Sequence, residues 1–349
     1  MKHNNKQLVF CALAAATALG ATPAFAQVTI SGFVDANVES ITSGGKTVKR
    51  VSSAGLNTSR IQFKAEEDLG GGLSAKAVHE ITFGADTGVM GTPRESYVQL
   101  AHRDYGDISL GRLNLSSYWI YGYADPTFSA DYSLISNMMV FYAPWRESNA
   151  VQVNSARVGG FQFKGTLTAG KEDGTKNGRV SSIGFDYRNG PLYMGLVTDH
   201  KYQSNIYQAS KMESSTDSYL SVVYRLGAHD LTAVLHHYSG YYAYPPYVDF
   251  RSSGNTIQIG ARFNLDERQR IFVSLVRRND ANDTDIADAT GLVVGYQYNL
   301  SKRTTLYGVV GTIHHKQDTD IRYPLSWGAA SPLSNENPHG AQLGIRVAF

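Results

Sequence analysis

The 349-residue sequence has a single cysteine, Cys11, so no disulfide can form within the chain and the fold must depend on hydrogen bonding and packing. After residue 26 it has no run of about 20 apolar residues, which a transmembrane helix requires. Neither sign of charge is in large excess: 32 Lys and Arg stand against 30 Asp and Glu, whereas a nucleic-acid-binding protein would carry a basic surplus. If the chain spans a membrane, it must do so as a closed β-barrel, because lipid cannot satisfy the hydrogen bonds of backbone N–H and C=O groups.

The sequence also lacks the motifs of common catalytic and metal sites. It has no glycine-rich phosphate loop, no zinc-ligand spacing and no nucleophile elbow. Two histidine pairs, His236-His237 and His314-His315, would lie on strands, where neighbouring side chains point to opposite faces and are poorly placed to share one metal ion. We therefore expect no enzymatic activity, no cofactor and no metal site. A lipid hydrolase built on a barrel stays a formal alternative, since Ser and His are present.

The N-terminus has the three parts of a secretory signal. Two lysines are followed by an apolar stretch over residues 8–19 and by Ala24-Phe25-Ala26, an A-x-A cleavage sequence. The apolar stretch is too short to span a membrane comfortably. We expect a signal peptide over residues 1–26, whose cleavage removes Cys11 and two positive charges. The mature domain over residues 27–349 is then formally neutral.

Short segments rich in Val, Ile, Thr, Tyr and Phe alternate polar with apolar residues, as strands with one apolar face do. Residues 60–65, 161–168 and 257–263 show this alternation clearly. A soluble sandwich would turn the apolar face to a core and an outer-membrane barrel would turn it to lipid, so periodicity alone does not separate the two. An even number of strands, sixteen, can be placed near residues 28–39, 58–67, 72–83, 95–102, 107–112, 149–157, 161–170, 178–188, 191–199, 216–226, 230–239, 254–264, 269–278, 289–299, 304–314 and 339–349.

The connections between these strands alternate in length. Short ones, such as residues 69–72, 103–106 and 189–191, contain turn-forming Gly, Asn and Asp. Outer-membrane barrels have short periplasmic turns and long external loops, whereas a soluble sandwich has less reason to show this pattern. The long segments are residues 40–57, 113–148, 200–215, 240–253, 279–288 and 315–338.

A family resemblance lies in segments that follow one another along the chain. They are Val28 to Ala36, Ser59-Arg60, Glu67 to Ala75, Arg94 to Leu100, Gly106 to Arg112, and Tyr298 to Thr304 with Leu306-Tyr307. In this order they resemble the Gram-negative general porins of the Neisseria and Burkholderia type, most weakly across residues 172–215 and 240–253. The resemblance implies an all-β fold, a transmembrane antiparallel β-barrel of 16 strands with a long third loop folded into the lumen. It also implies a homotrimer in the cell outer membrane.

The final strand carries a further signal. Ala341, Leu343, Ile345, Val347 and Phe349 occupy alternate positions and give one apolar face that ends in an aromatic carboxyl-terminal residue. In the resembled family such an ending is read by the barrel-assembly machinery. The resemblance therefore implies this machinery as a partner, Phe349 as an assembly signal and outer-membrane lipids as surroundings. An ordinary amphipathic strand that happens to close the chain is the alternative interpretation.

The filter of such a channel is expected in the long segment after Arg112. Sixteen strands enclose a wide lumen, so selectivity requires something that narrows it. The resemblance places the third loop there, with Asp125 and Asp131 as its acids, and a transverse field between these acids and a basic wall would sort ions by charge. The wall candidates are Arg60, Arg94 and Arg157, followed by Lys64, Lys76 and Arg112.

The strand that carries Arg60 gives the clearest wall assignment. Arg60, Gln62 and Lys64 share its polar face, and a charge on the lipid face would cost about 2–4 kcal/mol at the bilayer midplane. A solvated rim position is the alternative for each wall residue. On the next strand, His79 stands where an apolar lipid-facing residue is expected, which leaves the register of that strand open.

The function implied is a general diffusion porin, a water-filled channel for ions and small hydrophilic solutes. The alternative is a substrate-selective channel, with the tyrosine-rich stretch from Tyr238 to Tyr247 as a solute slide near the mouth, although such tyrosines more often belong to interface girdles. Basic wall residues favour a mild anion preference and loop acids could reverse it. The sequence therefore leaves the ion preference open.

Overall fold

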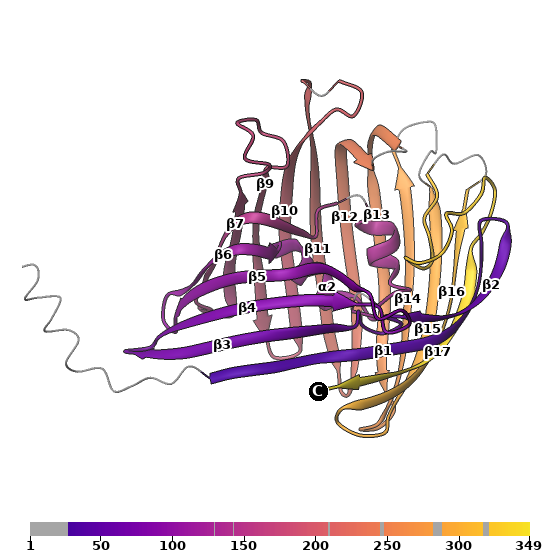
Figure 1. Cartoon of the computed structure of the whole chain (residues 1–349), viewed down its shortest axis with the longest axis horizontal. Coiled ribbons are helices and arrows are strands. Elements are labelled where there is room, and N and C mark those ends of the chain that lie inside the picture. The colour runs from indigo at the N-terminus through magenta and orange to yellow at the C-terminus, as the bar shows by residue number, and fades with distance from the viewer. Residues whose placement is uncertain are drawn as a thin grey trace, which may run out of the picture.

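The computed structural model describes residues 27–128, 130–141, 143–208, 210–244, 248–281, 288–316 and 321–349. In these residues one antiparallel sheet of 17 strands curls round until its first strand, β1, pairs with its last, β17 (Figure 1). The predicted signal peptide, residues 1–26, lies outside the described residues. Among the helices of the described part of the chain, none has the length and apolar character needed to cross a membrane.

Consecutive strands pair as neighbours in the wall, except β2 and β3, which both pair with β1. Their bounds are β1 (Gln27–Ser43), β2 (Lys46–Ser53), β3 (Arg60–Gly70), β4 (Leu73–Phe83), β5 (Met90–His102), β6 (Gly106–Asn114), β7 (Arg146–Ser155), β8 (Phe161–Thr168), β9 (Val180–Asn189), β10 (Leu192–Ser204), β11 (Met212–Leu226), β12 (His229–Tyr244), β13 (Val248–Asn264), β14 (Gln269–Asp280), β15 (Ala289–Asn299), β16 (Thr304–His315) and β17 (His339–Ala348).

All sixteen predicted strands are present, which confirms the all-β antiparallel barrel. The additional strand, β2, lies inside residues 40–57, for which the sequence predicts a loop. β2 and β3 both pair with β1, one after the other along its length: the later part of β1 pairs with β2 and the earlier part pairs with β3. The two therefore share one place in the wall, and 17 strands fill the 16 predicted positions.

Asp35 on β1 holds the break between β2 and β3. Its carboxylate accepts hydrogen bonds from the backbone N–H groups of Gly55 (3.1 Å), Leu56 (3.0 Å) and Asn57 (2.9 Å). The hydroxyl of Tyr307 on β16 donates a further one, at 2.5 Å. Because Asp35 is fully buried, these bonds replace the water that its carboxylate loses. The chain between the two strands is thereby held against the inner side of the wall.

The barrel closes through the last residue of the chain. The backbone N–H of Phe349 donates to the carbonyl of Gly32 (3.2 Å), and the N–H of Gly32 donates to the carbonyl of Phe349 (3.1 Å). A Cβ at position 32 would lie 2.1 Å from the carbonyl oxygen of Arg60 and 2.8 Å from the ring of Phe349. Glycine is therefore required where β1 meets both of its neighbours.

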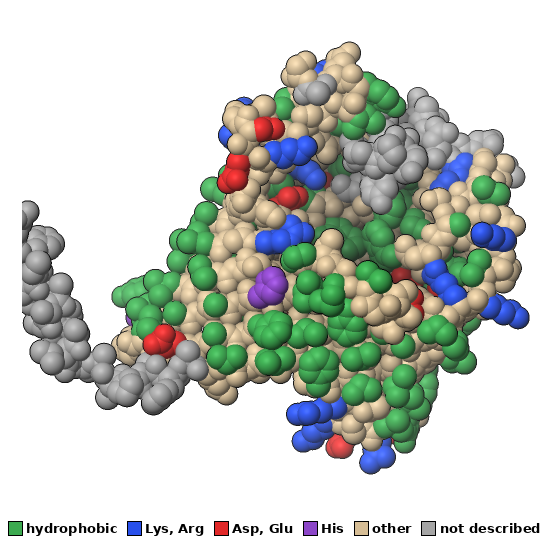
Figure 2. All heavy atoms as spheres, in the orientation of Figure 1, with side chains coloured by type: hydrophobic (Ala, Val, Ile, Leu, Met, Phe, Trp, Pro, Cys, Tyr) green, Lys and Arg blue, Asp and Glu red, His purple; other side chains and the backbone are tan. Residues whose placement is uncertain are grey.

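Side chains alternate between an apolar outer face and a polar lumen. On β5, Val98 and Leu100 are exposed on the outer face, whereas Tyr97 and Gln99 line a cavity inside the barrel. Figure 2 shows hydrophobic side chains spread across the middle of the visible surface, and most Lys and Arg side chains toward its upper left, its right-hand edge and its bottom. A barrel whose outer face meets lipid has this arrangement.

The segment 115–145 between β6 and β7 is here named the lumen loop, and its described residues lie inside the ring of strands (Figure 1). It contains the helix α2 (Ser116–Ala124) and a single π-helical turn, η1 (Ile135–Met139). α2 contacts the strands from β8 to β12, and η1 contacts β14. The lumen loop therefore crosses the interior and narrows it.

Glycines in the wall make room for the lumen loop. A Cβ at Gly195 would lie 2.8 Å from the side chain of Ile120, and a Cβ at Gly291 would lie 2.7 Å from the side chains of Leu134 and Met138. These distances are shorter than van der Waals contact. Larger wall residues at either position would push the loop away from its seat.

Candidate functional site

Asp125, predicted as a constriction acid, fixes the turn that follows α2. Its carboxylate accepts hydrogen bonds from the N–H and hydroxyl groups of Thr127 (2.9 and 2.7 Å) and from the hydroxyl of Ser133 (2.5 Å). Only 1% of Asp125 is exposed. The structure thus places this acid in the framework of the lumen loop, where it faces the loop's own donors.

Asp131, the second predicted acid, ties the lumen loop to the barrel. Its carboxylate accepts hydrogen bonds from the hydroxyl of Ser326 (2.7 Å), the backbone N–H of Trp327 (3.0 Å) and the side-chain amide of Gln342 on β17 (2.8 Å). Burial raises the pKa of Asp131 to about 6, although the three hydrogen bonds act in the opposite direction. A carboxyl group whose charge changes near pH 6 therefore stands beside the lumen.

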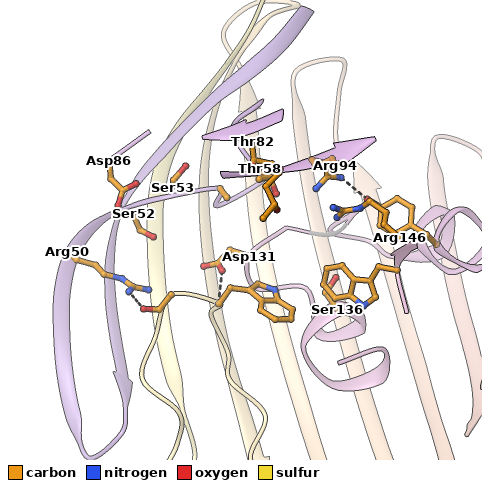
Figure 3. A pocket seen from close by; sticks show the side chains of 16 residues that line it. Arg50, Ser52, Ser53, Thr58, Thr82, Asp86, Arg94, Asp131, Ser136 and Arg146 are labelled. Atoms are coloured by element: carbon orange, nitrogen blue, oxygen red, sulfur yellow. Dashed lines mark hydrogen bonds between the residues drawn. The ribbon is translucent and has the colours of Figure 1, made fainter. Parts of the chain in front are cut away.

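A cavity of about 470 Å³, the loop-side cavity, lies between the lumen loop and the strand ends from which the long loops leave. Arg50, Arg94 and Arg146 are its cations, and Asp86 and Asp131 are its acids. Figure 3 shows Arg94 and Arg146 together on one side of this cavity and Arg50 on the other, with Asp131 between them. Among the lining residues three cations stand against two acids, and two of the cations are paired with carboxylates behind the lining, Arg50 with Glu39 and Arg94 with Glu80.

Two wall arginines share one carboxylate next to this cavity. Glu80 accepts a hydrogen bond from Arg94 Nε at 2.6 Å, and its other oxygen lies 3.4 Å from Arg60 Nε and 3.0 Å from Gln62 Nε2. Arg94 also donates to the hydroxyl of Tyr118 on α2, at 3.4 Å. Arg60, Arg94 and the nearby Arg146 face two carboxylates, Glu80 and Glu95, so one net positive charge is left where the wall meets the lumen loop.

An extra residue in β5 brings two charged side chains into the lumen. The pairing of β5 with β4 slips by one residue between Pro93 and Ser96. This β-bulge lets Arg94 and Glu95 both point inward, although neighbours on a regular strand face opposite ways. Arg94 lines the loop-side cavity, and Glu95 lines a second cavity on the other side of the lumen loop.

This second space, the turn-side cavity, has a volume of about 420 Å³ and lies toward the short turns. The lumen loop contributes aromatic side chains to it, and the wall contributes amides and hydroxyls such as Gln99 and Asn154. Lys164 and Arg188 bring positive charge at the end near the turns, and Glu95 brings negative charge. The aromatic residues are Trp119, Tyr123 and Phe128.

Three further wall candidates lie nearer the short turns than Arg60 and Arg94 do. Lys64 pairs with Glu66 at 2.9 Å, and Lys76 lies 5.8 Å from the ring centre of Tyr97. Arg157 forms an ion pair with Asp186 on β9. The structure therefore does not bring these three cations to the wall arginines beside the lumen loop, Arg60, Arg94 and Arg146.

Arg112 is not brought into the lumen with the other candidates. Ser109 and Leu113 of the same strand line the turn-side cavity, so alternation turns Arg112 to the outer face. There its guanidinium donates to the carbonyl of Pro93 (3.0 Å) and the hydroxyl of Ser148 (2.9 Å). His79 also faces outward, 3.2 Å from the hydroxyl of Ser96, at the lipid-facing position that the sequence marks as unusual for histidine.

Two arginines of the loop-side cavity are absent from the sequence-based set, Arg50 and Arg146. Arg50 lies on β2, within the expected loop, and pairs with Glu39 at 2.5 Å. Arg146 opens β7, and among the described residues it forms no salt bridge and its Nε has no hydrogen-bond partner. A basic residue at the point where a long loop re-enters the wall is the signal that could have identified it.

The tyrosine-rich stretch predicted as an alternative solute slide supports the lumen loop instead. Tyr238 and Tyr242 are buried, and Tyr247 lies outside the described residues. The guanidinium of Arg278 lies 3.8 Å from the ring centre of Tyr238 and donates to the carbonyl of Met138 in η1, at 2.8 Å. These side chains form a contact between wall and loop.

A closed antiparallel barrel with an apolar outer face and a charged lumen narrowed by an inner loop is an outer-membrane channel. The chain belongs to the Gram-negative porin family, whose family model matches residues 12–318. Outer membrane porin protein 32 of Delftia acidovorans is 27% identical over 97% of this chain and 98% of that protein. Family membership confirms the predicted outer-membrane location and a diffusion channel rather than an enzyme.

Solved structures show the same fold. An anion-selective porin from Comamonas acidovorans has a TM-score of 0.82 at 23% identity, covering 93% of this chain and 100% of that one. OmpF of Salmonella typhi, in a complex with daunomycin, has a TM-score of 0.71 at 14% identity, covering 93% of this chain and 98% of that one. At sequence identities this low, the similarity shows a shared barrel fold and says nothing about ion selectivity.

Proposed function

We propose that this porin is a general diffusion channel with a preference for anions. The observation that carries the proposal is the pair of arginines, Arg60 and Arg94, on the single carboxylate of Glu80. Arg146 adds a charge with no salt bridge among the described residues. Fixed positive charge at a narrow point raises the local concentration of anions and lowers that of cations. The description of the Comamonas acidovorans structure as anion-selective supports the same preference.

Among the residues that line each cavity, the cations outnumber the acids. The loop-side cavity has three arginines and two carboxylates, and one of those carboxylates, Asp131, is engaged by three hydrogen bonds. The turn-side cavity has Lys164 and Arg188 with Glu95. A solute that crosses the channel passes both, so an anion meets favourable charge on each side of the lumen loop.

The working form is a homotrimer, delivered by a signal peptide over residues 1–26 and inserted by assembly machinery that reads Phe349. The trimer form of OmpT from Vibrio cholerae, with a TM-score of 0.64 at 13% identity, supports this oligomeric state. Native mass spectrometry of the detergent-purified protein tests it directly, because a monomer as the sole species would exclude the trimer.

Reversal-potential measurement in a planar bilayer tests the ion preference. Under a KCl gradient, a potential of the sign set by chloride supports the proposal, and one of the sign set by potassium refutes it. The conductance should also rise in proportion to bulk salt. Saturation of the conductance with salt would instead favour a substrate-selective channel with a tight binding site.

A further inference from the structure

The lumen exposes aromatic surface where an aqueous pore would be expected to show polar groups. On the lumen loop, Trp119 is 43% exposed and Phe128 is 38% exposed, and both line the turn-side cavity together with Tyr123. Apolar area left in water is unfavourable in free energy. A solute with an apolar face would recover that free energy by covering these rings.

Cationic side chains lie at the end of the same cavity. Arg157, Lys164 and Arg188 surround the buried carboxylate of Asp186, with Lys164 Nζ at 3.5 Å and Arg188 Nε at 3.6 Å from its oxygens. One carboxylate balances only one of these three charges. The side chain of Arg188 is half exposed, so its charge is accessible to a solute.

Arg188 also joins the charged end to the aromatic side. Its guanidinium lies 5.0 Å from the ring centre of Tyr123 and 5.2 Å from that of Tyr193. This stacking orients the guanidinium, whose planar fork is suited to bidentate contact with a carboxylate. The cavity therefore offers a guanidinium and exposed rings within one space.

The opposite wall is polar and fixed in place. The side-chain amide of Gln99 donates to Asp107 and to the hydroxyl of Ser109, both at 3.0 Å, and the amide of Asn154 donates to Asp107 at 3.0 Å. Glu95 lies on the same wall, further from the short turns than Gln99. A second negative charge on a solute would therefore be repelled at that end.

We propose that the turn-side cavity is a binding site for planar aromatic monocarboxylates on their way through the channel. The ring lies against Trp119 and Phe128, and the carboxylate contacts Arg188 and Lys164. The volume of the turn-side cavity, about 420 Å³, is within the ~300–1,000 Å³ typical of small-molecule sites. This inference rests on the proposed channel function and specifies a solute class for it.

Block of the ionic current by benzoate tests the site. In about 0.1 M KCl, benzoate should reduce the single-channel chloride current with a saturable concentration dependence. Butyrate lacks the ring and benzyl alcohol lacks the charge, so each should need roughly tenfold higher concentrations. Terephthalate, whose second carboxylate points toward Glu95, should also block more weakly than benzoate.

Matched variants assign the block to this cavity. Trp119→Leu and Arg188→Gln should each raise the half-blocking concentration of benzoate roughly five- to tenfold, and Arg188→Lys should recover part of that loss. Trp327→Leu, a change of the same type in the loop-side cavity, should leave the half-blocking concentration unchanged. Each recorded channel is a folded one, since only inserted barrels conduct.

Equal block by benzoate and butyrate, or equal effects of Trp119→Leu and Trp327→Leu, would overturn the site. Equal block by benzoate and terephthalate would overturn the assigned orientation. None of these results would contradict the general channel function, because conductance and reversal potential in KCl alone are measured without benzoate. A channel that fails in KCl alone would contradict the proposed function itself.

Discussion

Replacing Arg146 by Gln is the sharpest test of how the lumen selects ions. The guanidinium lines the loop-side cavity and forms no salt bridge among the described residues, so its removal deletes a whole charge rather than half of an ion pair. Glutamine keeps most of the side-chain volume. The expected result is a reversal potential shifted toward that of potassium, with the channel still open.

The size of the shift follows from Coulomb's law. For an ion passing about 6 Å away in water, one unit charge changes the energy by about 0.7 kcal/mol, and screening in about 0.1 M salt reduces this to about 0.4 kcal/mol. The change has opposite signs for chloride and potassium, so the two effects multiply in the permeability ratio. Arg146→Gln should therefore lower the chloride-to-potassium ratio by about four- to tenfold.

Bilayer recordings of reversal potential under a KCl gradient measure this ratio directly. The matched control is Arg112→Gln, which removes the same charge from the outer face of β6 and should leave the ratio unchanged. The shift produced by Arg146→Gln should shrink in concentrated salt, since screening weakens the field. Equal shifts from the two variants, or none from Arg146→Gln, would refute the view that the loop-side cavity selects ions.

Three further predictions concern the same wall and the closure of the barrel. Glu80→Gln removes the acid between Arg60 and Arg94, so the chloride-to-potassium ratio should rise by a factor similar to the one above; a fall would contradict the shared-carboxylate arrangement. Because the pKa of Asp131 is raised to about 6, its negative charge is present above that pH and is lost below it. Anion preference should thus increase as the pH falls from 7.5 to 5, and Asp131→Asn should make that increase smaller; an unchanged pH dependence in Asp131→Asn would exclude this group. Deletion of Phe349 should lower the amount of heat-resistant barrel in outer membranes, measured by gel mobility before and after boiling, and normal amounts would remove its role in assembly.

The uninterrupted strands could be predicted from their alternation. Arg60, Gln62 and Lys64 lie on one face of β3 as the sequence indicates, because no bulge interrupts the pairing between β3 and β4 at these residues. Arg94 and Glu95 could not both be assigned to the lumen, since the bulge that turns them inward leaves no mark in the pattern of polar and apolar residues.

The ends of strands that extend beyond the lipid-facing band also could not be predicted from the sequence. β12 and β13 stay paired well past their predicted limits at residues 239 and 254. Outward positions there, such as Arg251 and Ser253, are polar, so the apolar alternation that marks a strand has already ended while backbone hydrogen bonds continue. For the same reason the strand β2, which contains Arg50, lies in a segment that the sequence predicts to be a loop.

The roles of the two acids of the lumen loop depend on contacts that are distant in sequence or local in geometry. Asp131 meets Ser326 and Gln342 only after the barrel has closed, and no spacing rule connects them. Asp125 bonds Thr127 and Ser133, a local turn whose hydrogen bonds are common in short loops. An acidic residue in a loop of the right length therefore predicts which segment enters the lumen, but it does not predict which groups the carboxylate contacts.

The hydrogen bonds between Gly32 and Phe349 also remove the two free edges of the sheet. They join the first strand to the last, across the greatest sequence separation in the wall, and the barrel is open until this seam forms. Until then β1 and β17 each present an open edge that could pair with another chain. Epitope tags for expression therefore belong in an exposed loop, such as residues 171–176 between β8 and β9, and not after Phe349.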